Sequence, residues 1–124
     1  TIALRVASAN GNSHFYYIPG CAAFPDDLAQ RLHGAPLVLF DGTLWQDDEM
    51  ITSSVGVKTG NRMGHMSISG KAGTLAAFRT LDVKRKIFIH LNNTNPVLME
   101  DSPERKCATD ADWEVAYDGM EIRL

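Results

Sequence analysis

The chain has 124 residues, of which 44% are hydrophobic, and it carries a formal net charge of −3. This composition is typical of one globular domain, and a slight excess of acid, with a basic run only at Lys84–Lys86, argues against nucleic acid as a partner. No apolar run approaches the roughly 20 residues of a bilayer span, and the N-terminus lacks a signal-peptide pattern. Cys21 and Cys107 fit no two-cysteine metal motif, so we expect a soluble protein with reduced thiols in the cytoplasm.

The first 41 residues predict a β-hairpin, a helix and a strand. Apolar residues alternate with polar ones at 2–6 and 15–17, on either side of the turn-forming run Asn10–Ser13, which is typical of a hairpin. Pro25, followed by two aspartates, favours a helix over about 25–33, and Gly34 fits its C-terminal cap. The unbroken apolar run PLVLF at 36–40 is typical of a strand that is buried on both faces.

The rest of the chain predicts a long loop and then alternating helices and strands. The hydrophobic residues within 44–66 follow no sustained period, which predicts an irregular loop. The acidic run 47–49 in this loop is typical of a solvated surface. The later elements are a helix of about ten residues within 67–81, a buried strand at 86–91, a short helix from Ser102 to about Asp110, and two short strands around Asp118-Gly119. This order indicates an α/β fold in which helices cover a mixed sheet.

Three polar residues of metal-binding type follow strand or loop ends. They are Asp41 after PLVLF, His65 in RMGHMSISG and His90 after KIFI. Ligand sites gather at strand ends, although each histidine also has a structural interpretation, because neutral imidazole packs well at sheet margins. Two imidazoles and a carboxylate suit zinc, iron or manganese, and such a set with open positions binds Fe(II) in oxygenases. The pattern therefore supports a metal-site hypothesis.

The polar run that follows His90 has two interpretations. Asn92–Asn95 precede Pro96, and their side chains either satisfy the backbone of a tight turn or hold substrate near His90. Cys21 likewise reads as a small buried hydrophobic residue or as a metal contact. His14 and His33, in a hairpin strand and near a helix end, have the weakest case for a functional role.

Three long segments resemble a known family. LVLFDGTLWQDDEM, GVKTGNRMGHMSISG and KIFIHLNNTNPVLMEDSPER, in this order, closely resemble the C-terminal half of the pyrroloquinoline quinone (PQQ) biosynthesis protein B family. The resemblance implies a metallo-β-lactamase-like αββα sandwich, of which residues 1–124 would form the C-terminal half. The other sheet and the first metal motif would then lie upstream, and we expect the isolated chain to be inactive.

The wider superfamily suggests a role for each of four residues. Cys21 stands where hydrolytic relatives of the ribonuclease Z type carry an aspartate that bridges two zinc ions. FDGT is similar to the His-Glu-Ala-Thr motif of these relatives, and Asp41 takes the acidic position in it. His65 stands at the position of the catalytic loop. His90 stands at the position of the last metal ligand. Without the bridging carboxylate two cations would lie close together with too little negative charge between them, so a mononuclear site is expected.

The family resemblance implies an iron-dependent hydroxylation of the tyrosine in a glutamate–tyrosine precursor of PQQ. His90 would bind Fe(II), or zinc in purified protein, Asp41 would orient a ligand, and His65 would exchange a proton near the substrate. Asn93 and Asn95 would bind the amino-acid ends of this small precursor. Other PQQ biosynthesis proteins are expected partners, and a homodimer is compatible with the sequence.

Two other functions compete with the hydroxylase. A carrier for the finished quinone would need cations for the carboxylates of its ligand, and Lys58 and Arg62 are the candidates near His65. A zinc hydrolase of the usual superfamily kind is the third option, and Cys21 argues against it.

Overall fold

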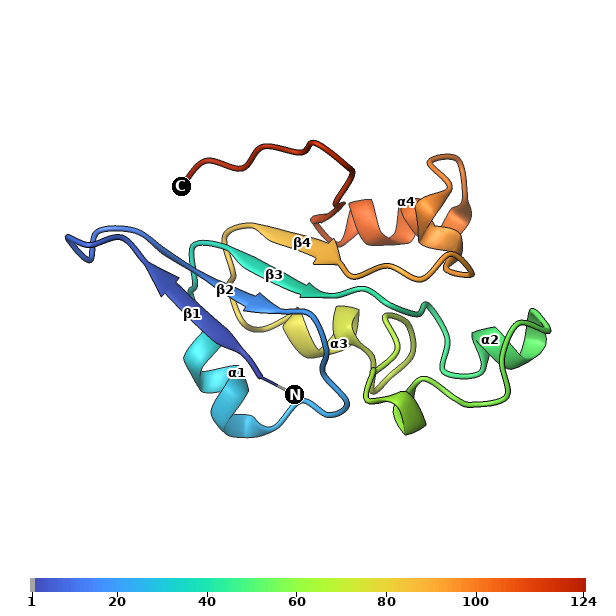
Figure 1. The fold of residues 1–124 in the computed structure, drawn as a ribbon. Helices are drawn as coiled ribbons and strands as arrows, with labels where there is room; N and C mark the ends of the chain where they lie inside the picture. The colour runs from blue at the N-terminus through green and yellow to red at the C-terminus, as the bar shows by residue number, and fades with distance from the viewer. Residues whose placement is uncertain (1) are drawn as a thin grey trace.

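The computed structural model describes residues 2–124, which form one five-stranded sheet in the order β1-β2-β3-β4-β5 (Figure 1). The first two strands pair antiparallel and every later pair is parallel. The C-terminal ends of the four parallel strands therefore meet at one edge, where α/β folds place their sites. The strands are β1 Leu4–Ala7, β2 His14–Ile18, β3 Val38–Asp41, β4 Lys86–Ile89 and β5 Trp113–Val115.

The helices connect the parallel strands and contribute to one core. They are α1 Asp26–Leu32, α2 Glu49–Thr52, α3 Thr74–Phe78 and α4 Pro103–Asp110, with short 3-10 helices η1 Asn61–Met63 and η2 Pro96–Leu98. One buried cluster joins Leu32, Phe78 and Ala108 of these helices to Phe40 and Phe88 of the central strands. The apolar runs at β3 and β4 therefore form largely buried strands, as predicted, and the structure places β3 at the centre of the sheet with β4 beside it. No helix within residues 2–124 combines the length and hydropathy that a bilayer span requires.

Several predicted elements are confirmed at their predicted places. The hairpin forms from β1 and β2, and the first helix begins after Pro25. The last helix begins after Ser102, whose hydroxyl accepts a hydrogen bond from the Arg105 amide at 3.0 Å. Pro103 occupies the first turn, where its missing N–H leaves no hydrogen bond unmade.

Two predicted elements differ from the structure. The helix expected within 67–81 has only five residues, because the chain turns at Gly70 with φ of +88° and the helix begins after Gly73. The second C-terminal strand is absent: the Met120 amide donates to the Tyr117 carbonyl in a turn, and residues 121–124 pair with no strand.

The acidic run in the long loop is not a uniformly solvated surface. Glu49 is only 6% exposed, and its carboxylate accepts hydrogen bonds from the Trp45 amide at 2.9 Å and from the Thr94 hydroxyl at 2.7 Å. Asp47 accepts a hydrogen bond from the Asn61 amide at 2.7 Å. These contacts fasten the loop to itself and to the loop after β4, since a buried carboxylate needs such partners.

Gly42 allows the chain to continue past Asp41, the last residue of β3, in close contact with β4. A Cβ at this position would lie 2.7 Å from Phe88 Cβ and 3.1 Å from the Ile89 carbonyl oxygen. Only glycine therefore lets the chain leave β3 in close contact with β4. The Gly42 amide also donates to the Ile89 carbonyl at 2.8 Å, which extends the pairing past Asp41.

We predict that Glu49→Gln removes a pH dependence from folding stability. Burial raises the pKa of Glu49 above its ordinary value of 4.5, so the folded chain holds this proton more tightly than the unfolded chain. The stability that the neutral carboxyl contributes is complete below the unfolded pKa and is lost as pH rises through the raised folded pKa. The variant should therefore gain stability relative to the parent as pH rises from the unfolded pKa of Glu49 through its raised folded pKa.

Urea denaturation at a series of pH values measures this difference. Glu121→Gln removes the same charge from an exposed position and serves as the control. A constant difference between Glu49→Gln and the parent over the whole pH range would contradict the prediction.

Candidate metal centre

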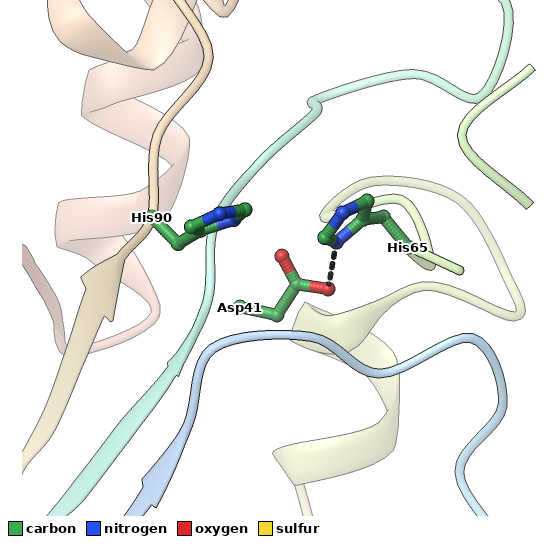
Figure 2. Close-up of side chains that lie close together, drawn as sticks. All are labelled: Asp41, His65 and His90. Carbon is green, nitrogen blue, oxygen red and sulfur yellow. Dashed lines mark hydrogen bonds and ion pairs between the residues drawn. The ribbon is translucent and has the colours of Figure 1, made fainter. Parts of the chain in front are cut away.

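Three side chains converge at the C-terminal edge of the parallel strands (Figure 2). Asp41 is the last residue of β3, His90 directly follows β4, and His65 comes from the loop before α3. One ligand atom from each residue lies within 4.8 Å of the other two. Among residues 2–124 this is the group of histidine, cysteine and acidic side chains with metal-binding geometry. The structure thus brings together the three residues that the sequence indicated.

Asp41 is completely buried, and its carboxylate is surrounded by hydrogen-bond donors. Oδ2 accepts from the Cys21 amide at 2.9 Å and lies 2.9 Å from His65 Nδ1. Oδ1 accepts from the Thr43 amide at 3.1 Å and from the Thr43 hydroxyl at 2.6 Å. Because both oxygens have two partners each, the carboxylate is held in one orientation. It holds the His65 ring through Nδ1, which leaves Nε2 free.

His90 has an unusual backbone conformation. Its φ of +56° lies in the left-handed region, which is disfavoured for residues with a Cβ and often occurs at functional sites. The His90 ring stacks beside that of His65, with centroids 5.2 Å apart and planes inclined by 26°. The Thr43 oxygen lies 2.8 Å from His90 Nδ1 and 2.9 Å from the His90 carbonyl oxygen. The exposed ring is therefore held from behind by a buried hydroxyl.

Cys21 contacts the site through its backbone. The amide binds Asp41, while the buried thiol donates to the Ala23 carbonyl at 3.0 Å. Burial, together with the negative charge of Asp41, raises the pKa of the Cys21 thiol to about 11. The thiol is thus protonated at neutral pH, and Cys21 lies outside the group of three converging ligands. Metal contact by Cys21 remains a prediction.

The two asparagines expected to bind substrate occupy different environments. Asn95 is 2% exposed, and its amide nitrogen donates to the Gly42 carbonyl at 2.8 Å. The Asn95 side-chain oxygen accepts from the Val97 amide at 3.0 Å, which caps η2. Asn93 is exposed on the same loop. The side chain of Asn95 therefore serves the structure, and Asn93 is the one of the pair that a ligand can reach.

Sequence reasoning missed two residues near His90. Thr43 contacts all three candidate ligands, and the only signal for it was its place two positions after Asp41 in FDGT. Arg105 lines a hollow of about 560 Å³ beside His90, and no local motif indicated it. The cations predicted near His65, Lys58 and Arg62, are both exposed in the long loop and do not line this hollow.

Comparisons with known proteins identify a family and several similar proteins. Residues 1–91 match the family model of the beta-lactamase superfamily domain. The chain is 59% identical over 119 residues to coenzyme PQQ synthesis protein B of Gluconacetobacter diazotrophicus, which covers 96% of this chain and 39% of that protein. It is 61% identical over 115 residues to the protein of that name from Xanthomonas campestris pv. campestris, which covers 93% of this chain and 38% of the relative. The chain thus spans about two fifths of these relatives.

Two solved structures resemble the fold. Zn²⁺-bound PqqB from Methylobacterium extorquens superposes with a TM-score of 0.89 at 47% identity, over 94% of this chain and 42% of that one. A diphosphatase of the PhnP family superposes with a TM-score of 0.56 at 16% identity, over 99% of this chain and 42% of that one. The second similarity shows the fold alone.

We predict that the two asparagines differ in their effect on stability. Asn95→Ala leaves the Gly42 carbonyl and the Val97 amide without their partner and should lower the free energy of unfolding by about 1–3 kcal/mol. Asn93→Ala, the matched control in the same loop, should change it by less than about 0.5 kcal/mol. Urea denaturation of both variants tests the assignment, which is wrong if they are equally stable.

The two cysteines should differ in reactivity. The thiolate is the reactive form, and the buried Cys21 thiol, with its pKa of about 11, forms little of it at neutral pH. Cys107 is exposed. With iodoacetamide at neutral pH we therefore expect Cys107 to be modified first and Cys21 only after denaturation. Peptide mass spectrometry follows both sites, and equal rates in the folded chain would refute the assigned environment of Cys21.

Proposed function

The chain belongs to the β-lactamase superfamily, and we propose that Asp41, His65 and His90 are part of the metal centre of a protein of PQQ biosynthesis. The sequence matches confirm the predicted resemblance to PQQ biosynthesis protein B, and the structural match confirms the metallo-β-lactamase-like fold. The observation that carries the proposal is the convergence of the three side chains at the ends of β3 and β4. We propose that residues 1–124 correspond to the C-terminal half of such a protein.

The residues present fit a metal ion. Two imidazoles beside a carboxylate form a donor set that suits zinc and iron. The Zn²⁺-bound state of the similar Methylobacterium protein supports a metal in this fold. Because the Asp41 oxygens are already engaged by the chain, the imidazole of His90 is the group best placed to face an ion, and the His65 ring lies beside it. The remaining ligands would come from the part of the relatives that this chain does not span.

The finer proposal is hydroxylation of the tyrosine in a glutamate–tyrosine precursor, with Fe(II) as the resident metal in the cytoplasm. When bound, iron supplies the activation of molecular oxygen for such a reaction. His90 would hold the metal, and Asp41 would orient His65 so that its Nε2 exchanges a proton at the substrate. Asn93 would contact the amino-acid end of the precursor. Partners would be this precursor and other PQQ biosynthesis proteins.

A carrier for the finished quinone is the second candidate. The hollow of about 560 Å³ beside His90 is lined by Arg105, a cation that suits a carboxylate-rich ligand. The guanidinium Nε donates to the Val97 carbonyl at 2.7 Å, which fixes its direction. Binding without turnover would use the same edge of the sheet.

We predict that His90→Ala weakens Fe(II) binding at least tenfold, whereas His33→Ala has no effect. The tenfold bound is about the smallest effect expected when even a supporting partner of a metal ligand is lost. Both variants are made in a protein that joins this chain to the remaining portion of the Gluconacetobacter relative, and iron is titrated anaerobically. His33 is exposed and lies at the end of α1, so it controls for loss of an imidazole. Undiminished iron binding by His90→Ala would remove His90 from the centre.

Oxygen uptake by the same joined protein separates the two functions. With Fe(II) and a glutamate–tyrosine peptide, a hydroxylase consumes oxygen, and His65→Ala should lower the rate by about 10²–10⁴-fold, as for loss of a general acid or base. Absence of uptake together with binding of PQQ would favour the carrier.

A further inference from the structure

The hydroxyl of Thr43 lies at the centre of the site. Thr43 is 7% exposed, and its Oγ1 is 2.6 Å from Asp41 Oδ1, 2.8 Å from His90 Nδ1 and 3.1 Å from His65 Nδ1. The same oxygen is 2.9 Å from the His90 carbonyl oxygen. One side chain therefore contacts the carboxylate and both imidazoles.

We propose that Thr43 is a positioning residue that sets the tautomer of His90, so that its Nδ1 carries the proton and its Nε2 presents a lone pair. A threonine hydroxyl has one proton to donate and can accept through its lone pairs. Two of its neighbours here, Asp41 Oδ1 and the His90 carbonyl, are oxygens that only accept. If the proton went to an imidazole instead, both oxygens would face the Thr43 lone pairs at short range, whereas donation to one oxygen leaves a single contact of this kind.

The Asp41 carboxylate is the better acceptor of the two oxygens. Its distance of 2.6 Å is that of a charge-assisted O–H···O⁻ bond. Once the proton is given to either oxygen, Thr43 Oγ1 can only accept from the imidazoles. A hydrogen bond at 2.8 Å to His90 then requires a proton on Nδ1. The tautomer thus follows from counting protons in the network, which is how ring protonation is assigned from heavy-atom positions.

His65 has the same tautomer because of a different hydrogen-bond partner. Its Nδ1 lies 2.9 Å from Asp41 Oδ2, which accepts, so the carboxylate alone holds the proton on Nδ1. For His90 Nδ1, Thr43 is the hydrogen-bond partner that the structure gives within residues 2–124. Loss of the Thr43 hydroxyl should therefore release His90 and leave His65 unchanged.

The tautomer determines which ring nitrogen of each histidine is available to a ligand. Metals bind the unprotonated ring nitrogen, and a partner on the other nitrogen fixes which one that is. Asp41 acts on His65 directly and on His90 through the Thr43 hydroxyl, so one buried carboxylate prepares two Nε2 atoms. This consequence for metal binding rests on the proposed function, whereas the tautomer itself does not.

The test is nitrogen-15 NMR of the histidine rings in the metal-free 124-residue chain, at about pH 8, where ordinary imidazoles are neutral. We expect Nδ1-protonated, Nε2-unprotonated rings for His65 and His90 in the parent chain and in Thr43→Ser, which keeps the hydroxyl. In Thr43→Val, which keeps the shape, His90 should lose this pattern and His65 should keep it. His14 and His33 provide reference signals.

Each outcome decides the proposal. A proton on Nε2 of His90 in the parent chain overturns it without any variant, so the test survives if Thr43→Val fails to fold. An unchanged His90 tautomer in folded Thr43→Val overturns it as well. A purely structural role for Thr43 would lower stability without the selective change at His90.

Titration of the joined protein with Zn²⁺ distinguishes this inference from the proposed function. Thr43→Val in that protein should bind Zn²⁺ about 10–100-fold more weakly than the parent and Thr43→Ser, the usual effect of losing the partner of a ligating histidine. The expected tautomers in the 124-residue chain, together with no response of the joined protein to Zn²⁺, would support the assignment and count against the metal centre.

Discussion

The buried carboxylate of Asp41 is the constraint on which the site depends. An ionised carboxylate without partners costs several kcal/mol to remove from water, so it is stable at the end of β3 only because donors surround it. Those donors come from three segments that are distant in the sequence: the Cys21 amide after β2, Thr43 after β3, and His65 from the loop before α3. Asp41 therefore fixes the positions of all three. The burial of Asp41 therefore orders this edge of the sheet.

A second group of buried polar contacts holds the loops around Asp41. Asn95 binds the Gly42 carbonyl, and Glu49 binds the Thr94 hydroxyl. The loops after β3 and β4 are thus fastened to each other. The exposed His90 ring, in its left-handed backbone conformation, lies directly beside this anchored segment. Rigid support of this kind is what a binding site requires from irregular loops.

Much of this arrangement could be predicted from local sequence. The apolar runs at β3 and β4 indicated strands buried on both faces, and Asp41 and His90 at their ends followed from the same pattern. The burial of Glu49 could not be predicted, because it depends on a hydrogen bond to Thr94, 45 positions away. The role of Thr43 could not be predicted for the same reason, because its partner His90 is 47 positions away in the sequence. The prediction of a second C-terminal strand was wrong because Asp118-Gly119 indicates only that the chain reverses. It does not indicate whether the segment after the turn pairs with another strand.

The distribution of hydrogen bonds determines where the site can react. Within residues 2–124, every buried side-chain nitrogen and oxygen has a hydrogen-bond partner. Behind the imidazoles, Asp41 and Thr43 use their hydrogen-bonding capacity on each other and on the two Nδ1 atoms. In front, His65 and His90 line a hollow of about 570 Å³ whose other walls include the apolar side chains of Ile2 and Leu4. Among the lining residues only Tyr17 has a polar side-chain group besides the two imidazoles, so a cation or a polar substrate group in this hollow would interact mainly with these rings. The carboxylate then acts on such a ligand through the imidazoles that it orients.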